Sequence, residues 1–235
     1  MGLLQYEFRE CTDPGCRFRF PAPANAKLGD KCPRCGAIVQ VVIKASFEPE
    51  NNPDSQPNVG NQVEGINQTA GSNSLPPHST HFLAALIDNI RSTWNVGSML
   101  RTADGAGIRH LYLCGISPTP EHPHVTRTAL GAEHSIPWSW HPNSIDLAKE
   151  LLGMGYQLWA LEAVPGAVPI YSAPPLASLE RVALVIGNEI AGIDPGLLAL
   201  CQACFWIPMH GVKRSLNAAV AFGIAAYTLQ GESYP

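Results

Sequence analysis

A long polar segment, residues 48–80, constrains this chain because it divides the sequence into two parts that must fold separately. It consists mainly of Asn, Pro, Gly, Ser and Gln and has almost no large apolar residues. Such a composition cannot bury enough apolar surface to offset the conformational entropy that folding costs. We therefore expect a small module over residues 1–47, a flexible linker over residues 48–80, and a larger domain over residues 81–235.

The N-terminal module contains two close pairs of cysteines, spaced Cys11-x4-Cys16 and Cys32-x2-Cys35. Four thiolates on two tight turns can converge tetrahedrally on one zinc ion. A module this short also needs a metal to supplement its small core. The sequence therefore predicts a zinc-ribbon-like module with these four cysteines as ligands. The alternative is four free cysteines in an unstructured arm.

The remaining cysteines and a histidine pair offer weaker metal signals. Cys114 lies in an apolar run, and Cys201-x2-Cys204 has no second pair to complete a site. We interpret these three as small buried hydrophobic residues. His122 and His124 could ligate a metal, but their Pro-rich surroundings indicate a solvated loop.

The larger domain alternates apolar strands with helices. Strands are predicted over 82–87, 111–114, 156–161 and 182–186, which are nearly continuous apolar runs typical of buried parallel strands. Helices are predicted over 96–106, 144–154 and 216–229, with Asn95 and Ser144 as N-caps. This order predicts an α/β fold with a parallel sheet.

Three polar segments of this domain lie next to the predicted strands. They are residues 88–103 with Asn95 and Arg101, residues 185–192 with Gly187 and Glu189, and residues 207–219 with Ser215 and Asn217. Ligands of open α/β sheets bind at the carboxyl edge, where we expect Asn95 and Arg101 to face together. Gly187 would let a ligand approach the backbone closely. The alternative is that all three segments are only caps and turns. The glycine patterns of dinucleotide-binding, phosphate-loop and nucleophile-elbow sites are absent from the sequence.

The spacings N-x5-R, IGNE-x2-G and IPM-x-G-x3-SLN resemble motifs 1, 2 and 3 of the SpoU/TrmH branch of SPOUT RNA methyltransferases, over roughly residues 80–231. Residues 127–132 also resemble a family segment in the loop that faces the RNA. The resemblance implies an α/β fold with a deep C-terminal trefoil knot, one of the rare exceptions to unknotted topology. It further implies a homodimer, S-adenosylmethionine held in the knot, and methylation of a ribose 2′-hydroxyl in structured RNA, either tRNA or rRNA.

By matched position, the resemblance implies a catalytic set of Asn95, Arg101, Glu189, Ser215 and Asn217. It places the cofactor against the backbone around Leu161, Gly187, Ile207, Met209 and Leu216. Arg101 would act as a base assisted by an RNA phosphate, or as a clamp on that phosphate. Because a guanidinium is almost always charged, both roles stay open.

The charge distribution bears on the RNA partner. Residues 81–235 carry eight basic and eleven acidic side chains, so a basic cleft there requires local clustering. The module carries seven Lys and Arg residues and, with Phe18 and Phe20, could add RNA affinity at the end of its linker. A non-catalytic RNA- or ribosome-binding protein and a zinc-ribbon adaptor for a protein partner are the alternative functions. With no long apolar segment and no secretory signal pattern, we expect a cytoplasmic protein without membrane contact.

Overall fold

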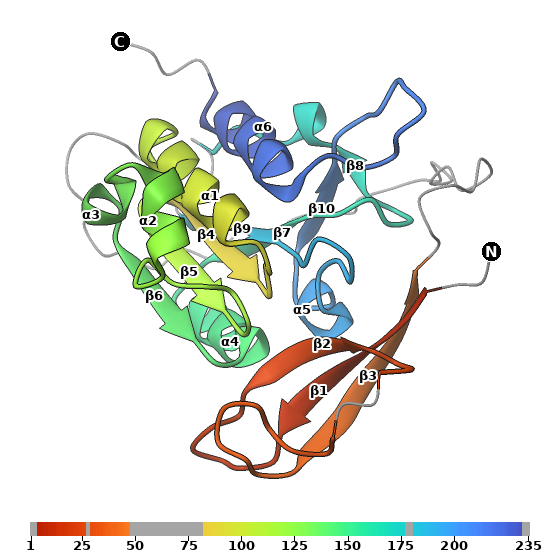
Figure 1. Cartoon of the computed structure of the whole chain (residues 1–235). Helices are drawn as coiled ribbons and strands as arrows, with labels where there is room; N and C mark the ends of the chain where they lie inside the picture. Colours follow the sequence, from red (N-terminus) through yellow and green to blue (C-terminus); the bar gives the residue numbers. More distant parts are fainter. Residues whose placement is uncertain (1–3, 27–28, 48–81, 177–180, 232–235) are drawn as a thin grey trace.

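The computed structural model describes residues 4–26, 29–47, 82–176 and 181–231 (Figure 1). The linker predicted over residues 48–80 lies outside these ranges. None of the described helices is long and apolar enough to span a membrane.

The N-terminal module is a three-stranded antiparallel sheet in the order β2-β1-β3. Its strands are β1 (Leu4–Cys11), β2 (Arg19–Pro23) and β3 (Val39–Phe47). A small core fills one side and includes Phe18, Phe20 and three of the paired cysteines. A core of this size is consistent with a module that needs further stabilisation.

The larger domain contains a seven-stranded parallel sheet in the order β6-β5-β4-β9-β7-β10-β8. Its strands are β4 (Phe82–Asp88), β5 (Leu111–Cys114), β6 (Trp138–His141), β7 (Gln157–Leu161), β8 (Val168–Pro169), β9 (Arg181–Ile186) and β10 (Ala203–Trp206). The helices are α1 (Thr93–Gly105), α2 (Pro123–Ala129), α3 (Ala132–Ser135), α4 (Ser144–Gly153), α5 (Pro195–Leu198) and α6 (Ala218–Gln230), with a 3₁₀ turn η1 (Ile170–Ser172). The predicted α/β class and parallel sheet are confirmed.

Helices cover both faces of this sheet (Figure 1). Along β4, Leu83, Ala85 and Ile87 pack in the core shared with α1 and α6, whereas Ala84 and Leu86 pack in the core shared with α4. Successive residues of a strand point to opposite faces. Both faces are therefore buried, which explains why the strands were continuous apolar runs in the sequence.

Two helix N-caps differ from the predicted ones, and α1 begins at Thr93, three residues before its predicted start. The side chain of Ser92, and not of Asn95, caps α1 by accepting a hydrogen bond from the Asn95 backbone N–H. Asn143 caps α4 in place of Ser144. In both cases two adjacent or nearby residues had suitable cap chemistry, and the packing of the helix decided between them. The earlier start of α1 leaves the Asn95 side chain available for another role.

The module packs directly against the larger domain, at α4 and α5 (Figure 1). Arg19 donates to both carboxylate oxygens of Asp194, the cap of α5, at 2.7 and 2.9 Å, and Arg17 pairs with Asp146 of α4. The Phe18 ring stacks near Trp140, with centroids 6.5 Å apart. The module therefore contacts the larger domain directly, and a contribution of the module to RNA affinity stays a prediction. Phe18 and Phe20 are buried and cannot serve as a surface for bases.

Candidate active site

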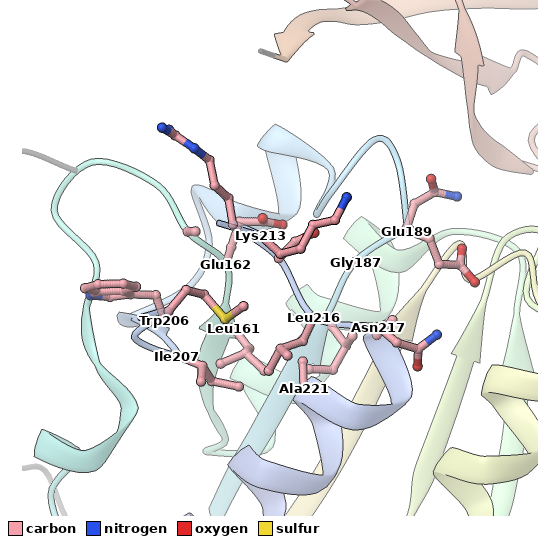
Figure 2. A pocket seen from close by; sticks show the side chains of 17 residues that line it. Leu161, Glu162, Gly187, Glu189, Trp206, Ile207, Lys213, Leu216, Asn217 and Ala221 are labelled. Carbon is pink, nitrogen blue, oxygen red and sulfur yellow. The ribbon is translucent and has the colours of Figure 1, made fainter. Parts of the chain in front are cut away.

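A cavity of about 500 Å³ opens where β7, β9 and β10 end (Figure 2). Leu161, Ile186 and Trp206 are the last residues of these strands, and all three line the cavity. The carboxyl ends of parallel strands meet at one edge of a sheet, which is where open α/β folds bind ligands. The other wall is the segment of residues 206–218 that leads into α6.

All five residues predicted to hold a cofactor line this cavity: Leu161, Gly187, Ile207, Met209 and Leu216. Three of the predicted catalytic residues line it as well: Glu189, Ser215 and Asn217. The mix of apolar side chains with a few polar groups is typical of a small-molecule site.

Gly187 has a different steric role from the predicted one. A Cβ atom on Gly187 would lie 2.2 Å from the backbone nitrogen of Ile193 and 2.3 Å from the carbonyl carbon of Gly192. Asn188 and Gly192 exchange backbone hydrogen bonds across this turn. The glycine is therefore required because the 187–193 loop folds back on itself, although its backbone also borders the cavity.

Glu162 is a cavity residue that the sequence analysis did not single out. Its carboxylate accepts a hydrogen bond from the backbone N–H of Ile193 at 3.0 Å and so holds the far end of the 187–193 loop. Burial raises the pKa of this carboxyl group above its ordinary value. An acid placed directly after the predicted strand 156–161 was the available signal.

Asn95, Glu189 and Asn217 form a hydrogen-bonded cluster beside the cavity. The Glu189 carboxylate accepts from Asn95 Nδ2 at 2.9 Å, and Asn217 Nδ2 donates to Asn95 Oδ1 at 3.0 Å. Figure 2 shows Glu189 and Asn217 at the end of the cavity near α6. The cluster joins three segments that are far apart in the sequence, which the motifs alone could not establish.

The Glu189 carboxylate has several donors. It also accepts from the backbone N–H groups of Arg91 at 2.9 Å and Ser92 at 3.0 Å, just before α1. An anion in this position is stabilised by the partial positive charge of the helix N-terminus. Because three donors hold this carboxylate and one of them is Asn95 Nδ2, its arrangement suits orienting Asn95.

Arg101 does not lie with the other predicted catalytic residues. It lines a separate hollow of about 380 Å³ together with Asp104, Ser135 and residues 129–132. Since α1 begins at Thr93, Asn95 and Arg101 both lie inside the helix. Their side chains are six residues apart and so are rotated by about 600° about the helix axis, which is 120° short of two full turns. The expectation that both side chains face the same edge is therefore wrong for the described chain.

The segment over residues 127–132 is not a loop. Arg127 belongs to the last turn of α2, and Leu130 and Gly131 make a left-handed turn, with φ of 53° and 96°, into α3. The Leu130 side chain is 68% exposed. The segment borders the hollow that contains Arg101.

The paired cysteines of the module lie close together. The sulfur atoms of Cys11 and Cys35 are 3.4 Å apart, those of Cys16 and Cys32 are 3.9 Å apart, and all four lie within 4.8 Å of one another. Four thiolates at about 2.3 Å from a zinc ion would be about 3.8 Å apart. Burial raises the pKa of Cys11 to about 12, so a cation is needed to keep it as a thiolate at neutral pH.

The other candidate metal ligands do not form a cluster within the described part of the chain. Among the described residues, the four-cysteine cluster is the only group of three or more potential metal ligands. Burial raises the pKa of Cys201 to about 12 and of Cys204 to about 11, in keeping with their interpretation as hydrophobic residues. His122 and His124 are both exposed; His122 ends the preceding loop as the N-cap of α2, whereas His124 lies in the first turn of that helix and not in a loop.

Residues 83–227 match the family model described as the SpoU rRNA methylase family. The chain belongs to the SpoU family. Among its SpoU relatives is a 23S rRNA (guanosine(2553)-2′-O)-methyltransferase of Bacillus subtilis, 34% identical over 148 residues that cover 62% of this chain and 57% of the relative. Another is a tRNA (guanosine(18)-2′-O)-methyltransferase of Aquifex aeolicus, 26% identical, with 63% and 68% of the two chains covered.

A solved SpoU-like structure agrees with this assignment. An AdoMet-bound rRNA methyltransferase from Sinorhizobium meliloti superposes with a TM-score of 0.61 at 28% identity, covering 68% of this chain and 60% of that one. The chain thus spans less than two thirds of the first of these relatives and of this solved chain. The SpoU match itself excludes the cysteine module, which lies before residue 83.

Proposed function

We propose that this protein transfers a methyl group from S-adenosylmethionine to a ribose 2′-hydroxyl of a structured tRNA or rRNA. The observation that carries the proposal is the Asn95–Glu189–Asn217 cluster at the mouth of a cavity lined by the five predicted cofactor residues. Relatives named as 2′-O-methyltransferases of rRNA and tRNA support the same reaction. A binding protein without activity would have no chemical need for this cluster.

The cavity fits the proposed cofactor in size and chemistry. Leu161, Ile207 and Leu216 supply apolar walls for an adenosine group, and backbone groups of the cavity segments supply polar contacts. When bound, S-adenosylmethionine supplies an activated methyl group on a sulfonium. The resemblance further places this cavity in a C-terminal knot, which stays a prediction.

The protein's main contribution is orientation. Holding the ribose hydroxyl in line with the methyl group can contribute about 7–11 kcal/mol of the barrier. Asn95, fixed by Glu189 and Asn217, is placed to hold the hydroxyl, and Ser215 lies on the cavity wall to bind the hydroxyl or the cofactor carboxylate. Arg101, exposed on α1 outside the cavity, is assigned to an RNA phosphate, because its guanidinium retains its charge.

The remaining parts of the proposal concern assembly. The cysteine cluster holds one structural zinc ion, as the sulfur distances support. A homodimer would cover the exposed apolar side of α6, where Val220 is 50% and Tyr227 46% exposed. Relatives that modify RNA favour a cytoplasmic location.

The test uses purified full-length protein, tritiated S-adenosylmethionine and total RNA from a strain lacking the gene. Label in an alkali-resistant dinucleotide is the expected result and identifies the RNA. Asn95→Ala should abolish transfer and leave cofactor affinity within a few-fold. Cofactor binding without transfer to any RNA would refute the proposed reaction. A pH–rate profile without an ionisation near neutrality would support the clamp role of Arg101 over a base.

A further inference from the structure

An exposed tryptophan lies next to the candidate active site and has no place in the reaction described above. Trp94, in the first turn of α1, is 54% exposed. It is seven residues before Arg101, which places both on the same side of the helix and about 10 Å apart along its axis. A single exposed apolar side chain is common on a protein surface, so Trp94 indicates a binding surface only together with the groups that lie beside it.

The register of α1 explains why Trp94 points outward. Val96, Met99 and Leu100 are fully buried against the sheet, and the amide of Asn95 is bonded to Glu189. A neighbouring helix residue is rotated by about 100°, so the side chain before Asn95 must leave the packed face. The same contacts that assemble the candidate catalytic cluster therefore present Trp94 to the outside.

Two histidines of α2 extend this aromatic surface. The His124 ring lies 6.2 Å from the Trp94 ring, and the His122 ring lies 5.2 Å from that of His124. Gly97 permits this approach, because a Cβ atom there would lie only 2.5 Å from the carbonyl oxygen of Val125 in α2. We call the exposed rings of Trp94, His122 and His124 the Trp94 platform.

Three cationic side chains lie on the same two segments of the chain as the Trp94 platform. Arg91, Arg101 and Arg127 are all exposed on the adjoining α1 and α2 segments. Within the described ranges, no ion pair engages these three guanidinium groups. Aromatic rings on which bases stack, flanked by cations that hold phosphates, are the usual surface for unpaired RNA. A protein partner would fit the uncharged exposed side of α6 better.

We infer that the Trp94 platform stacks an unpaired base of the RNA substrate, adjacent to the ribose that is methylated. The inference rests on the proposed function and adds a subsite to it. Asn95 is the next residue in the chain, so a base on Trp94 belongs to a nucleotide close to the target ribose. The platform therefore selects RNA in which the neighbouring base is unstacked from a helix, such as a loop nucleotide.

The test compares Trp94→Ala, Trp94→Phe and a control, Tyr171→Ala, which removes an exposed ring on η1 (64% exposed). The probe is the unmethylated RNA fragment that the labelling experiment maps. Losing one stacked base should weaken RNA affinity by roughly 5- to 100-fold in Trp94→Ala. Trp94→Phe should retain affinity within about threefold. Tyr171→Ala should leave RNA affinity unchanged. In the Trp94 variants, cofactor affinity and the melting temperature should not change.

An abasic substitution in the RNA separates stacking from a general structural role. If the base beside the target ribose stacks on Trp94, removing that base and removing the ring should each weaken binding, and combining them should weaken it no further. Additive losses, an unchanged affinity of Trp94→Ala, or dissociation of a dimer in that variant would each overturn the inference. Methyl transfer by the wild type, measured first, shows separately whether the proposed function holds.

Discussion

The buried ion pair between the two parts of the chain allows a quantitative test through Arg19→Met. The Arg19 side chain is 7% exposed and that of Asp194 is 0% exposed, and the pair is bidentate. Methionine retains much of the side-chain length, so the substitution removes mainly the charge and its hydrogen bonds. The substitution leaves the buried Asp194 carboxylate without its ion-pair partner. It also removes the 2.9 Å pair of Arg19 with Glu10, which keeps its pair with Arg17.

The expected loss is large because a second carboxylate is close by. Asp88 is also buried, accepts a hydrogen bond from the Asp194 backbone N–H at 3.1 Å, and has its pKa raised to about 6 by burial and by the charge of Asp194. Breaking a buried pair by removing one partner typically costs about 3–5 kcal/mol. We therefore expect Arg19→Met to lose about that amount of unfolding free energy at pH 7, with a smaller loss at lower pH, where Asp88 takes up a proton and no longer repels the Asp194 carboxylate.

The assay is urea unfolding of the full chain, followed by tryptophan fluorescence and by protection of backbone amides in the module. Arg17→Met is the comparison variant, since the Arg17–Asp146 pair is partly exposed, with side chains 46% and 36% accessible, and the 3.1 Å pair of Arg17 with Glu10 also involves a half-exposed guanidinium. Such pairs contribute about 0–1 kcal/mol. A loss below about 1 kcal/mol for Arg19→Met, or equal losses for both variants, would refute the argument that this pair holds the module to the domain.

Three further predictions follow from other contacts. The pKa of Asp88 is about 6 in the folded protein, above its ordinary value of 3.8, so the folded state favours the protonated form. The stability that protonated Asp88 contributes is therefore fully present below about pH 4 and is lost as the pH rises through 6. The non-titrating Asp88→Asn keeps only one of the two hydrogen bonds that Asp88 accepts, but it should lack this pH dependence. In denaturant titrations its stability relative to wild type should therefore rise by up to about 3 kcal/mol from pH 4 to pH 7. Gly97→Ala should lower the unfolding free energy by about 1–2 kcal/mol, because the new Cβ atom would lie 2.5 Å from the Val125 carbonyl oxygen, which outweighs the better helix propensity of alanine. Gly153→Ala, with open space around the added Cβ, should not lower it. Equal Tm values for the two variants would contradict this. Treatment with a chelator should release one zinc ion per chain and change the fluorescence of Trp140, which contacts Phe18 and Arg34 of the module. Release of zinc without a change in tryptophan fluorescence would contradict the packing of the module against the larger domain.

The sequence predicted most of what depends on local pattern. The strands at 111–114 and 182–186 and the long helix after Asn217 follow from runs of apolar residues, and the structure reproduces them within one or two residues. The short strands β6 and β8 and the short helix α3 were missed, because two to four residues carry too little periodicity to be recognised.

In the candidate site, too, some residues were predicted from the sequence and others were not. The motif spacing identified Glu189, Ser215 and Asn217 without reference to the fold, and these residues share one cavity. Glu162 was missed, since nothing near it in the sequence indicates that its carboxylate holds the loop at Ile193. Arg101 was expected to face the same edge as Asn95, but six helical residues leave the two side chains about 120° apart, and Arg101 lines a different hollow.

The sequence by itself determined the fold class, the two-part organisation and the residue types available for chemistry, because hydrophobic periodicity and motif spacing are local properties of the chain. Only the tertiary structure decided which of these residues meet. The joining of Asn95 to Glu189 and Asn217, the pairing of Arg19 with Asp194, and the exposure of Trp94 beside His124 all depend on contacts between distant segments. Such contacts are set by how helices and strands pack together, and no pattern within a single segment specifies them.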